Sequence, residues 1–260
     1  MIHLNTLNQS TTSTATFPLI AIIDTALCVG AGGSSGSQAD KPILKTAEGR
    51  LVIPASQIKG RLRHECEKLT RSLGWPTCES PVAQTMCPQI GITDSAFQSI
   101  TDYDTGLQFA NGQTQYHCWI CQIFGNPALP ARVQLSDLIC TEPAENISEV
   151  LRPGVTINRR RRTAEEKKLY FLETSPVNAS LAFTGSITLE PGLPDLTKVL
   201  LIAGLKHIHA LGGSKSTGLG WLHWQSPLFD NPDIDPQVWK DLRGNNIDDD
   251  SPQSPMEEAS

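Results

Sequence analysis

No run in the 260-residue sequence approaches the roughly 20 consecutive apolar residues that a membrane-spanning helix needs. The first residues also lack the basic start and apolar core of a secretory signal peptide. The seven cysteines are an odd number, which does not suit a complete set of disulfides. We therefore expect a cytoplasmic protein with no membrane partner, whose cysteines are buried, catalytic or bound to metal.

The sequence also lacks the net positive charge expected of a nucleic-acid-binding protein, since its formal net charge is −6. The charge is unevenly distributed, however. Residues 230–260 carry nine acidic and two basic side chains, whereas residues 1–229 carry 18 acidic and 19 basic ones. We interpret residues 230–260 as an acidic, disordered tail, and residues 1–229 as one domain whose local basic patches can bind a polyanion.

Several motifs of common enzyme classes are missing as well. The sequence contains neither the GxxxxGK[ST] loop of nucleotide hydrolases nor the GxGxxG turn of dinucleotide-binding folds. No Ser/His/Asp arrangement stands out, and there is no internal repeat. These absences leave nucleotide hydrolases, dinucleotide-dependent enzymes and serine hydrolases without support.

What the sequence does contain is a short strand followed by a helix, in the stretch LVIPASQIKGRLRHECEKL at residues 51–69. Apolar residues recur at helical spacing after Pro54, and Ser56 is the expected N-cap. Cations near a helix N-terminus oppose the helix dipole, so a cluster of them there favours contact with an anion. An amphipathic helix with a solvated basic face is an equally open alternative on this stretch alone. The cations are Lys59, Arg61 and Arg63.

A second stretch, LGGSKSTGLG at residues 211–220, joins an apolar helical run to a short expected strand. A glycine-rich loop exposes backbone N–H groups, and with one cation it suits a phosphate backbone. The candidate contact residues are Gly213, Lys215, Ser216 and Thr217.

The cysteines carry the strongest signal for a metal. Cys118 and Cys121 form a CxxC pair, and Cys78 and Cys87 lie upstream in the same aperiodic segment. Four thiolates suit tetrahedral Zn²⁺ in a closed structural site, which would also keep a loop-rich insertion ordered. Unconnected buried cysteines are the alternative, and a redox CxxC lacks a thioredoxin-like setting. The alternative ligands are His64, Cys66 and His117.

Six segments resemble, in order, those of the RAMP superfamily of CRISPR-associated proteins, and in particular the repeated backbone subunit of type III effector complexes. IPASQIKGRLR is similar to the superfamily's IPGSSLKGxLR segment, and LGGSKSTGLGWLHW to its GGxxxxGxG loop and last strand. The other four are GAGGSSGSQADKPILK, CWICQIFGN, RVQLSDL and GVTINRRRRTAEEKKLYFLETSPVNASLAFTG. The resemblance runs from about Phe17 to Trp224.

The expected fold is α+β, with a ferredoxin-like (RRM-like) βαββαβ core. Without two insertions the pattern reads strand–helix–strands–helix–strand, which is compatible with that core, and the resemblance implies it. The first insertion, residues 74–130, holds the expected zinc site. The second, residues 152–176, is implied to be a "thumb" hairpin with a basic tip at residues 159–168. Expected strands cover residues 17–29, 51–53, 132–140, 180–189 and 220–224, and the second helix covers residues 196–211.

The resemblance implies a subunit that binds CRISPR guide RNA through residues 56–63 and 212–220. It would assemble with other RAMP-type subunits and the large subunit into a prokaryotic antiviral ribonucleoprotein complex. The thumb would push between guide and target RNA, with Arg159 and Arg160 on phosphates. Val155 and Ile157 could supply an apolar wedge.

Asp40 is the candidate catalytic residue, because the resemblance implies that an Asp at this position is required to cut target single-stranded RNA. The implied reaction is attack of the RNA's own 2′-OH on the adjacent phosphate, with Mg²⁺ or another divalent metal. Without the resemblance, a loop Asp that stabilises a turn would be the better interpretation. One rival is a subunit that binds RNA without cutting. A guide-processing nuclease of the same superfamily usually uses a histidine after the first strand, and none lies between His3 and His64.

Overall fold

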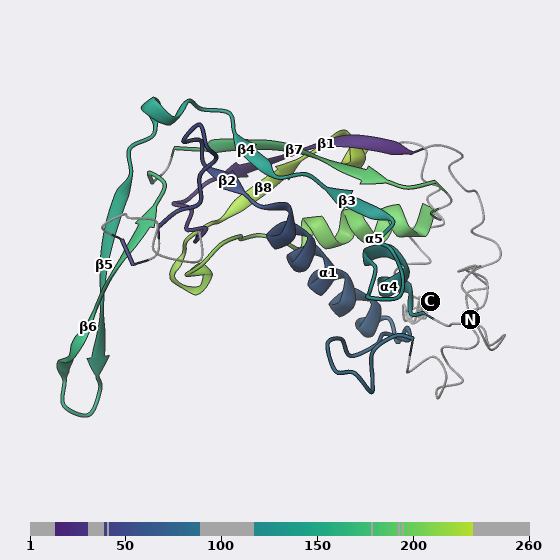
Figure 1. The fold of residues 1–260 in the computed structure, drawn as a ribbon, viewed down its shortest axis with the longest axis horizontal. Coiled ribbons are helices and arrows are strands. Elements are labelled where there is room, and N and C mark those ends of the chain that lie inside the picture. The colour runs from purple at the N-terminus through teal and green to yellow at the C-terminus, as the bar shows by residue number, and fades with distance from the viewer. Residues whose placement is uncertain are drawn as a thin grey trace, which may run out of the picture.

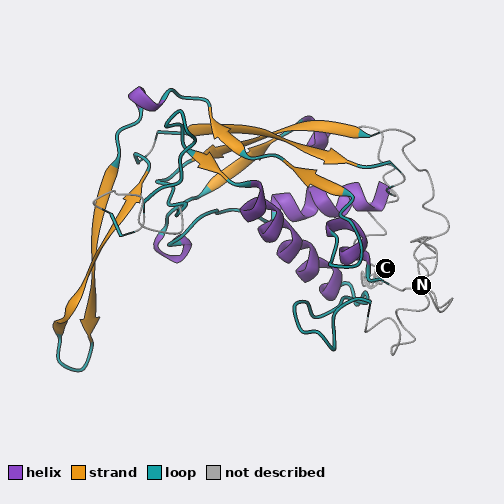
Figure 2. Ribbon diagram, viewed as in Figure 1, coloured by secondary structure: helices purple, strands orange, loops and turns teal. Residues whose placement is uncertain are grey.

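The computed structural model describes residues 14–30, 39–40, 42–88, 117–177, 179–191, 193 and 195–230. It shows a mixed α/β fold in which an antiparallel sheet carries its helices on one face, and a long hairpin projects from one end (Figures 1 and 2). The predicted acidic tail lies outside these residues, apart from Asp230. So do most of the glycine-rich segment after the first strand and residues 89–116 of the insertion.

The sheet has the strand order β2-β4-β7-β1-β8, and β3 also pairs with β7. Neighbouring strands are antiparallel throughout. The strands are β1 (Ala15–Ile23), β2 (Val52–Ile53), β3 (Val133–Leu135), β4 (Leu138–Cys140), β7 (Leu181–Leu189) and β8 (Leu222–Gln225). Side chains alternate along β1, where Leu19, Ala21 and Ile23 are buried against the helices. The prediction that this strand continues to residue 29 is wrong, because the chain leaves the sheet at Asp24.

Within the described part of the chain, two helices cover the sheet, α1 (Ala55–Ser72) and α5 (Asp195–Lys206). They pack closely because Gly204 faces Cys66, whose sulfur would lie 2.7 Å from a Cβ at that glycine. The helix α5 ends five residues before the predicted position 211, and β8 begins two residues after the predicted 220.

The start of α1 corrects a second prediction. Pro54, and not Ser56, is the N-cap, and no side chain caps the helix from that position. The Ala55 N–H instead donates to Asp137 Oδ1 at 2.7 Å. Asp137 lies in the break between β3 and β4, which were predicted as one strand over 132–140. The break between the strands places the carboxylate of Asp137 at the N-terminus of α1, where the helix dipole is positive.

The hairpin consists of β5 (Val150–Asn158) and β6 (Thr163–Thr174), which, among the strands of the described residues, pair with each other alone. It occupies the segment predicted to be the thumb, and we keep that name for it; its arms start two residues earlier and end two residues earlier than predicted. The turn itself spans Arg159–Arg162, so Lys167 and Lys168 belong to β6 and not to the tip.

The insertion contains a short helix, α4 (Trp119–Phe124), which the sequence did not predict, and α4 contacts α1. Three short 3₁₀ helices complete the described elements: η2 (Ala144–Asn146), η3 (Lys215–Thr217) and η4 (Pro227–Asp230). Among the helices of the described residues, none combines the length and the apolarity that crossing a membrane requires.

Candidate RNA-binding face and metal centre

The segment after β1, residues 24–30, joins the glycine-rich loop to the base of the thumb. Gly213 N–H donates to the Cys28 carbonyl at 2.7 Å, and Gly220 N–H donates to the Ala26 carbonyl at 2.8 Å. Leu27 exchanges two hydrogen bonds with Ser175, which follows β6: its N–H donates to Ser175 Oγ at 2.8 Å, and its carbonyl accepts from Ser175 N–H at 3.0 Å. The glycine-rich loop and the base of the thumb, which are nearly 40 residues apart in sequence, are thus both hydrogen-bonded to residues 26–28.

Asp40 belongs to the same end of the molecule. One of its carboxylate oxygens accepts a hydrogen bond from the backbone N–H of Phe171, in β6, at 2.7 Å. The residue is exposed, and its other carboxylate oxygen has no hydrogen bond to another described residue. The candidate catalytic group is therefore hydrogen-bonded to the thumb through one oxygen, while the residue as a whole is exposed.

The glycine-rich loop presents a row of backbone donors. Ser214 adopts a left-handed conformation (φ 54°), and η3 follows it. The N–H groups of Ser214, Lys215 and Ser216 make no hydrogen bond to any other part of the described chain. Successive free N–H groups around a left-handed residue form an anion-binding concavity. The predicted contacts lie here: Gly213, Lys215, Ser216 and Thr217 are exposed, although Lys215 Nζ donates to the Gly212 carbonyl at 3.0 Å and Thr217 Oγ1 to the Ser214 carbonyl at 2.7 Å.

The predicted cations of α1 differ in what they contact. Lys59 has no ion pair within the described residues, and partial burial, followed by repulsion from Arg63, lowers its pKa. Arg61 is paired with Glu65 at 2.7 Å. Arg63 donates to Glu67 and to the cysteine-bearing segment. Ser56 is exposed on the first turn. Lys59 is thus the most available of the three cations for an external anion.

The basic tip of the thumb lies far from these groups, at the end of the projecting hairpin (Figure 1). Asn158 shapes the turn, because its Oδ1 accepts from the N–H groups of Arg160 and Arg161, each at 3.1 Å. The four arginine side chains, including Arg159, are exposed and form no ion pair with a described acid. Val155 and Ile157, the predicted wedge residues, are 47% and 61% exposed.

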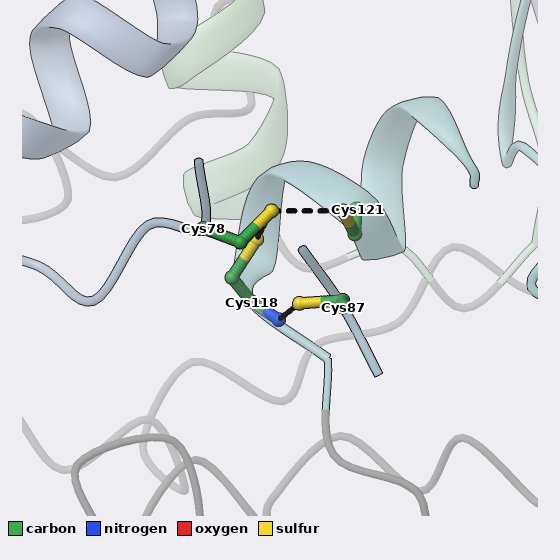
Figure 3. A group of neighbouring side chains, drawn as sticks. All are labelled: Cys78, Cys87, Cys118 and Cys121. Atoms are coloured by element: carbon green, nitrogen blue, oxygen red, sulfur yellow. Dashed lines mark hydrogen bonds between the residues drawn. The ribbon is translucent and has the colours of Figure 1, made fainter. Parts of the chain in front are cut away.

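The four predicted zinc ligands come together near the C-terminal end of α1. The sulfur atoms of Cys78, Cys87, Cys118 and Cys121 all lie within 4.8 Å of one another and are buried (Figure 3). The Cys78 sulfur is 3.6 Å from those of Cys118 and Cys121. Cys118 is the N-cap of α4 and Cys121 lies in its first turn, so the helix places both thiols on one side.

This arrangement fits zinc. Tetrahedral Zn²⁺ with bonds of about 2.3 Å to sulfur keeps its ligand atoms about 3.8 Å apart. The alternative ligands lie outside the group: His64 is exposed, His117 Nδ1 is 2.9 Å from the Asn126 amide, and Cys66 donates to the Leu200 carbonyl. Burial, with smaller contributions from Glu65 and Glu67, raises the pKa of Cys66, which leaves it an inert core thiol.

Sequence reasoning missed the polar network at the thumb base. Glu173, which is 3% exposed, accepts from Ile43 N–H at 3.3 Å and forms an ion pair with Lys45 at 3.2 Å. Lys45 also pairs with Glu149, next to the start of β5. Burial lowers the pKa of Lys45, but the two carboxylates outweigh it and the pKa ends above its usual value. Nothing in the local sequence pairs these residues, which only the fold brings together.

The fold and the site together define a class of protein: a mixed α/β domain with a projecting basic hairpin and an exposed glycine-rich loop at one end, and a buried four-cysteine group at the other. The model of the RAMP superfamily matches residues 22–223, and the chain belongs to that superfamily. Membership implies a CRISPR-associated, RNA-binding subunit of a prokaryote, and members are often CRISPR ribonucleases. No curated protein matches the chain.

Proposed function

We propose that this protein is a backbone subunit of a type III CRISPR effector complex. It binds the guide RNA and cuts the complementary target RNA by attack of the target's 2′-OH. The observation that carries the proposal is the connection of the glycine-rich loop, the thumb and Asp40 through residues 24–30 and Phe171. The strand order β8-β1-β7-β4, with α1 and α5 on one face, supports a ferredoxin-like core.

Guide binding rests on the loop and on α1. The free N–H groups of residues 214–216 take a phosphate, and Lys215 and Lys59 add charge that does not depend on base sequence. Ser56 and Arg61 remain predicted contacts, but Arg61 would have to leave its carboxylate partner Glu65. On the thumb, Arg159 and Arg160 contact the RNA backbone where the hairpin separates guide from target.

Cleavage depends on Asp40. The 2′-oxygen bonds to the adjacent phosphorus while the bond from phosphorus to the 5′-oxygen breaks. The 2′-oxygen loses its proton and the 5′-oxygen gains one, leaving a 2′,3′-cyclic phosphate and a 5′-hydroxyl. Asp40 holds the 2′-OH in line through its other carboxylate oxygen. Asp40 would also be the residue that holds a divalent cation such as Mg²⁺, which would neutralise the charge that develops on the phosphate.

The four-cysteine group holds a structural Zn²⁺, which keeps α4 and residues 78–88 against α1. We further propose that the subunit works in the cytoplasm, where it assembles with other RAMP-type subunits and the large subunit of the complex. The projecting thumb and its exposed apolar residues suit contacts with RNA and with neighbouring subunits.

A second candidate function is that of a non-cleaving RNA-binding subunit, and one observation favours it. The hydrogen bond from Phe171 gives Asp40 a structural role in holding the thumb. That role would explain an Asp at this position without catalysis.

One experiment tests the proposal and separates the two candidates. The complex is purified from its native host, its RNA is sequenced, and it is mixed with labelled RNA complementary to that guide. We expect CRISPR-derived guides, partner subunits, and metal-dependent cuts with cyclic-phosphate ends. Guide RNA without cleavage would support the non-cleaving subunit, and absence of RNA would contradict both.

A further inference from the structure

Arg63 was predicted as a phosphate contact, but all three of its guanidinium nitrogens donate inside the protein. Nε donates to Glu67 Oε1 at 3.0 Å, Nη1 to the Gly125 carbonyl at 2.9 Å, and Nη2 to the sulfur of Cys121 at 3.5 Å. The side chain is only 22% exposed. The planar fork of the guanidinium is thus directed at the cysteine group and at the end of α4.

The charge of a loaded centre explains why a cation belongs there. Four thiolates around one Zn²⁺ leave a net charge of −2, and the four cysteines are buried. A buried charge that is not compensated is costly, whereas a hydrogen-bonded cation beside it lowers that cost. Arg63 is positioned to do this for Cys121, and Glu67 on the next turn of α1 holds the guanidinium in place.

A second arginine on the same stripe of α1 supports the assignment. Arg71 lies two turns beyond Arg63, and its Nη2 donates to the Cys78 carbonyl at 3.4 Å. The helix therefore contacts both cysteine-bearing segments, one through each arginine. By contrast, Arg61, only two residues before Arg63, contacts Glu65 and no part of the cysteine group.

We infer that Arg63 is an outer-shell positioning residue of the metal centre, where it orients and stabilises the thiolate of Cys121, and that it is not a guide-RNA contact. The inference rests on the proposed zinc site but not on the proposed cleavage. Outer-shell partners of metal ligands typically change metal affinity by 10- to 100-fold when they are removed. Loss of the Nη2 hydrogen bond should also change the electron density on the sulfur.

The test compares Arg63→Gln, Arg63→Lys and the matched control Arg61→Gln in the full-length protein. Zinc release is timed with a coloured chelator, and the sulfur-to-metal charge-transfer band is recorded after Co²⁺ substitution. We expect release about 10-fold faster in Arg63→Gln. The charge-transfer band should shift in the same variant. Arg63→Lys should lie in between, because it keeps the charge without the fork, and Arg61→Gln should match the wild type in zinc release and in the charge-transfer band.

The same variants are titrated with a single-stranded oligoribonucleotide at several salt concentrations. Arg63→Gln should keep the wild-type salt dependence if the arginine serves the metal centre. Wild-type release and an unshifted band in Arg63→Gln, or a salt slope reduced by one phosphate contact, would overturn the inference. The inference would also be overturned if the wild-type protein contained no zinc, or if its Co²⁺ form did not show a tetrathiolate spectrum. The proposed RNA binding and cleavage would still be judged separately, by the guide and cleavage assays.

Discussion

The carboxylate of Asp40 accepts a hydrogen bond from the backbone N–H of Phe171 across 131 residues of sequence, at 2.7 Å. This contact links the loop that precedes β2 to the thumb. Any movement of the hairpin would therefore move the candidate catalytic group with it. Replacing Asp40 by alanine therefore removes both a negative charge and the hydrogen bond that anchors the loop to the thumb.

Two substitutions separate those roles. Asp40→Asn keeps an oxygen that can accept from Phe171 but loses the charge, whereas Asp40→Ala loses both. If the charge is required for catalysis, both variants should lose cutting at the sites set by this subunit. Asp40→Asn should retain target affinity within about twofold, because its anchor persists. Gel analysis of cleaved target and filter-binding titrations measure the two quantities.

Cleavage that survives in Asp40→Asn but fails in Asp40→Ala would assign Asp40 to anchoring the thumb. Undiminished cleavage in both would identify the protein as a scaffold at this step.

The order of elements could be predicted from the sequence because most of the strands and helices have a clear period. β1 and β7 alternate, and α1 repeats its apolar residues at helical spacing. The helix α4 had no such signal, since all six of its residues are buried. A helix without a polar face looks like any short apolar run.

The errors at element ends have a tertiary cause. The cap of α1 comes from Asp137, 82 residues away, so the local preference for Ser56 was irrelevant. The cations of α1 differ in this respect, because their pairing is local. Arg61 and Arg63 pair with Glu65 and Glu67, each four residues on, whereas the residue four after Lys59 is Arg63, so the helical spacing could have indicated which cation is available.

The phosphate assignment predicts a specific salt dependence. Replacing Lys59 and Lys215 together by Ala should weaken binding of RNA of any sequence. It should also flatten the slope of log affinity against log salt by roughly two units, about one for each lost contact. Lys68→Ala is the matched control, because Lys68 lies on the same helix and is paired with Glu65. A double variant with the slope of the control would contradict the assignment.

The metal assignment predicts that purified protein carries about one zinc per chain, which a closed four-thiolate site requires. Cys118→Ser with Cys121→Ser should lose most of that zinc and become more sensitive to protease within residues 74–88 and 117–125. Cys140→Ser is the control, since Cys140 is also buried but lies in β4, outside the group. Elemental analysis and limited proteolysis are the measurements, and full zinc content in the double variant would place the ligands elsewhere.

Two glycines of the loop offer a last test of how the phosphate-binding segment is held. Gly220 and Gly218 both have positive φ, +72° and +92°. A Cβ at Gly220 would lie 1.9 Å from the Leu211 carbonyl oxygen, whereas a Cβ at Gly218 would meet nothing within 4 Å. Gly218→Ala should therefore lose only about 1–2 kcal/mol of folding stability, because alanine is strained in the left-handed conformation.

Gly220→Ala adds a backbone collision to that strain. It would disrupt the hydrogen bonds that Gly220 makes with Leu211 and Ala26, at 2.9 and 2.8 Å. We expect Gly220→Ala to lower the free energy of unfolding by on the order of 4 kcal/mol, which is typical of substitutions that create a steric conflict in the protein interior. Its RNA affinity should fall too, because the same contacts place the loop beside residues 24–30. Denaturant unfolding and RNA titration of the two variants measure this, and equal losses at both positions would mean that the loop is not held through Gly220.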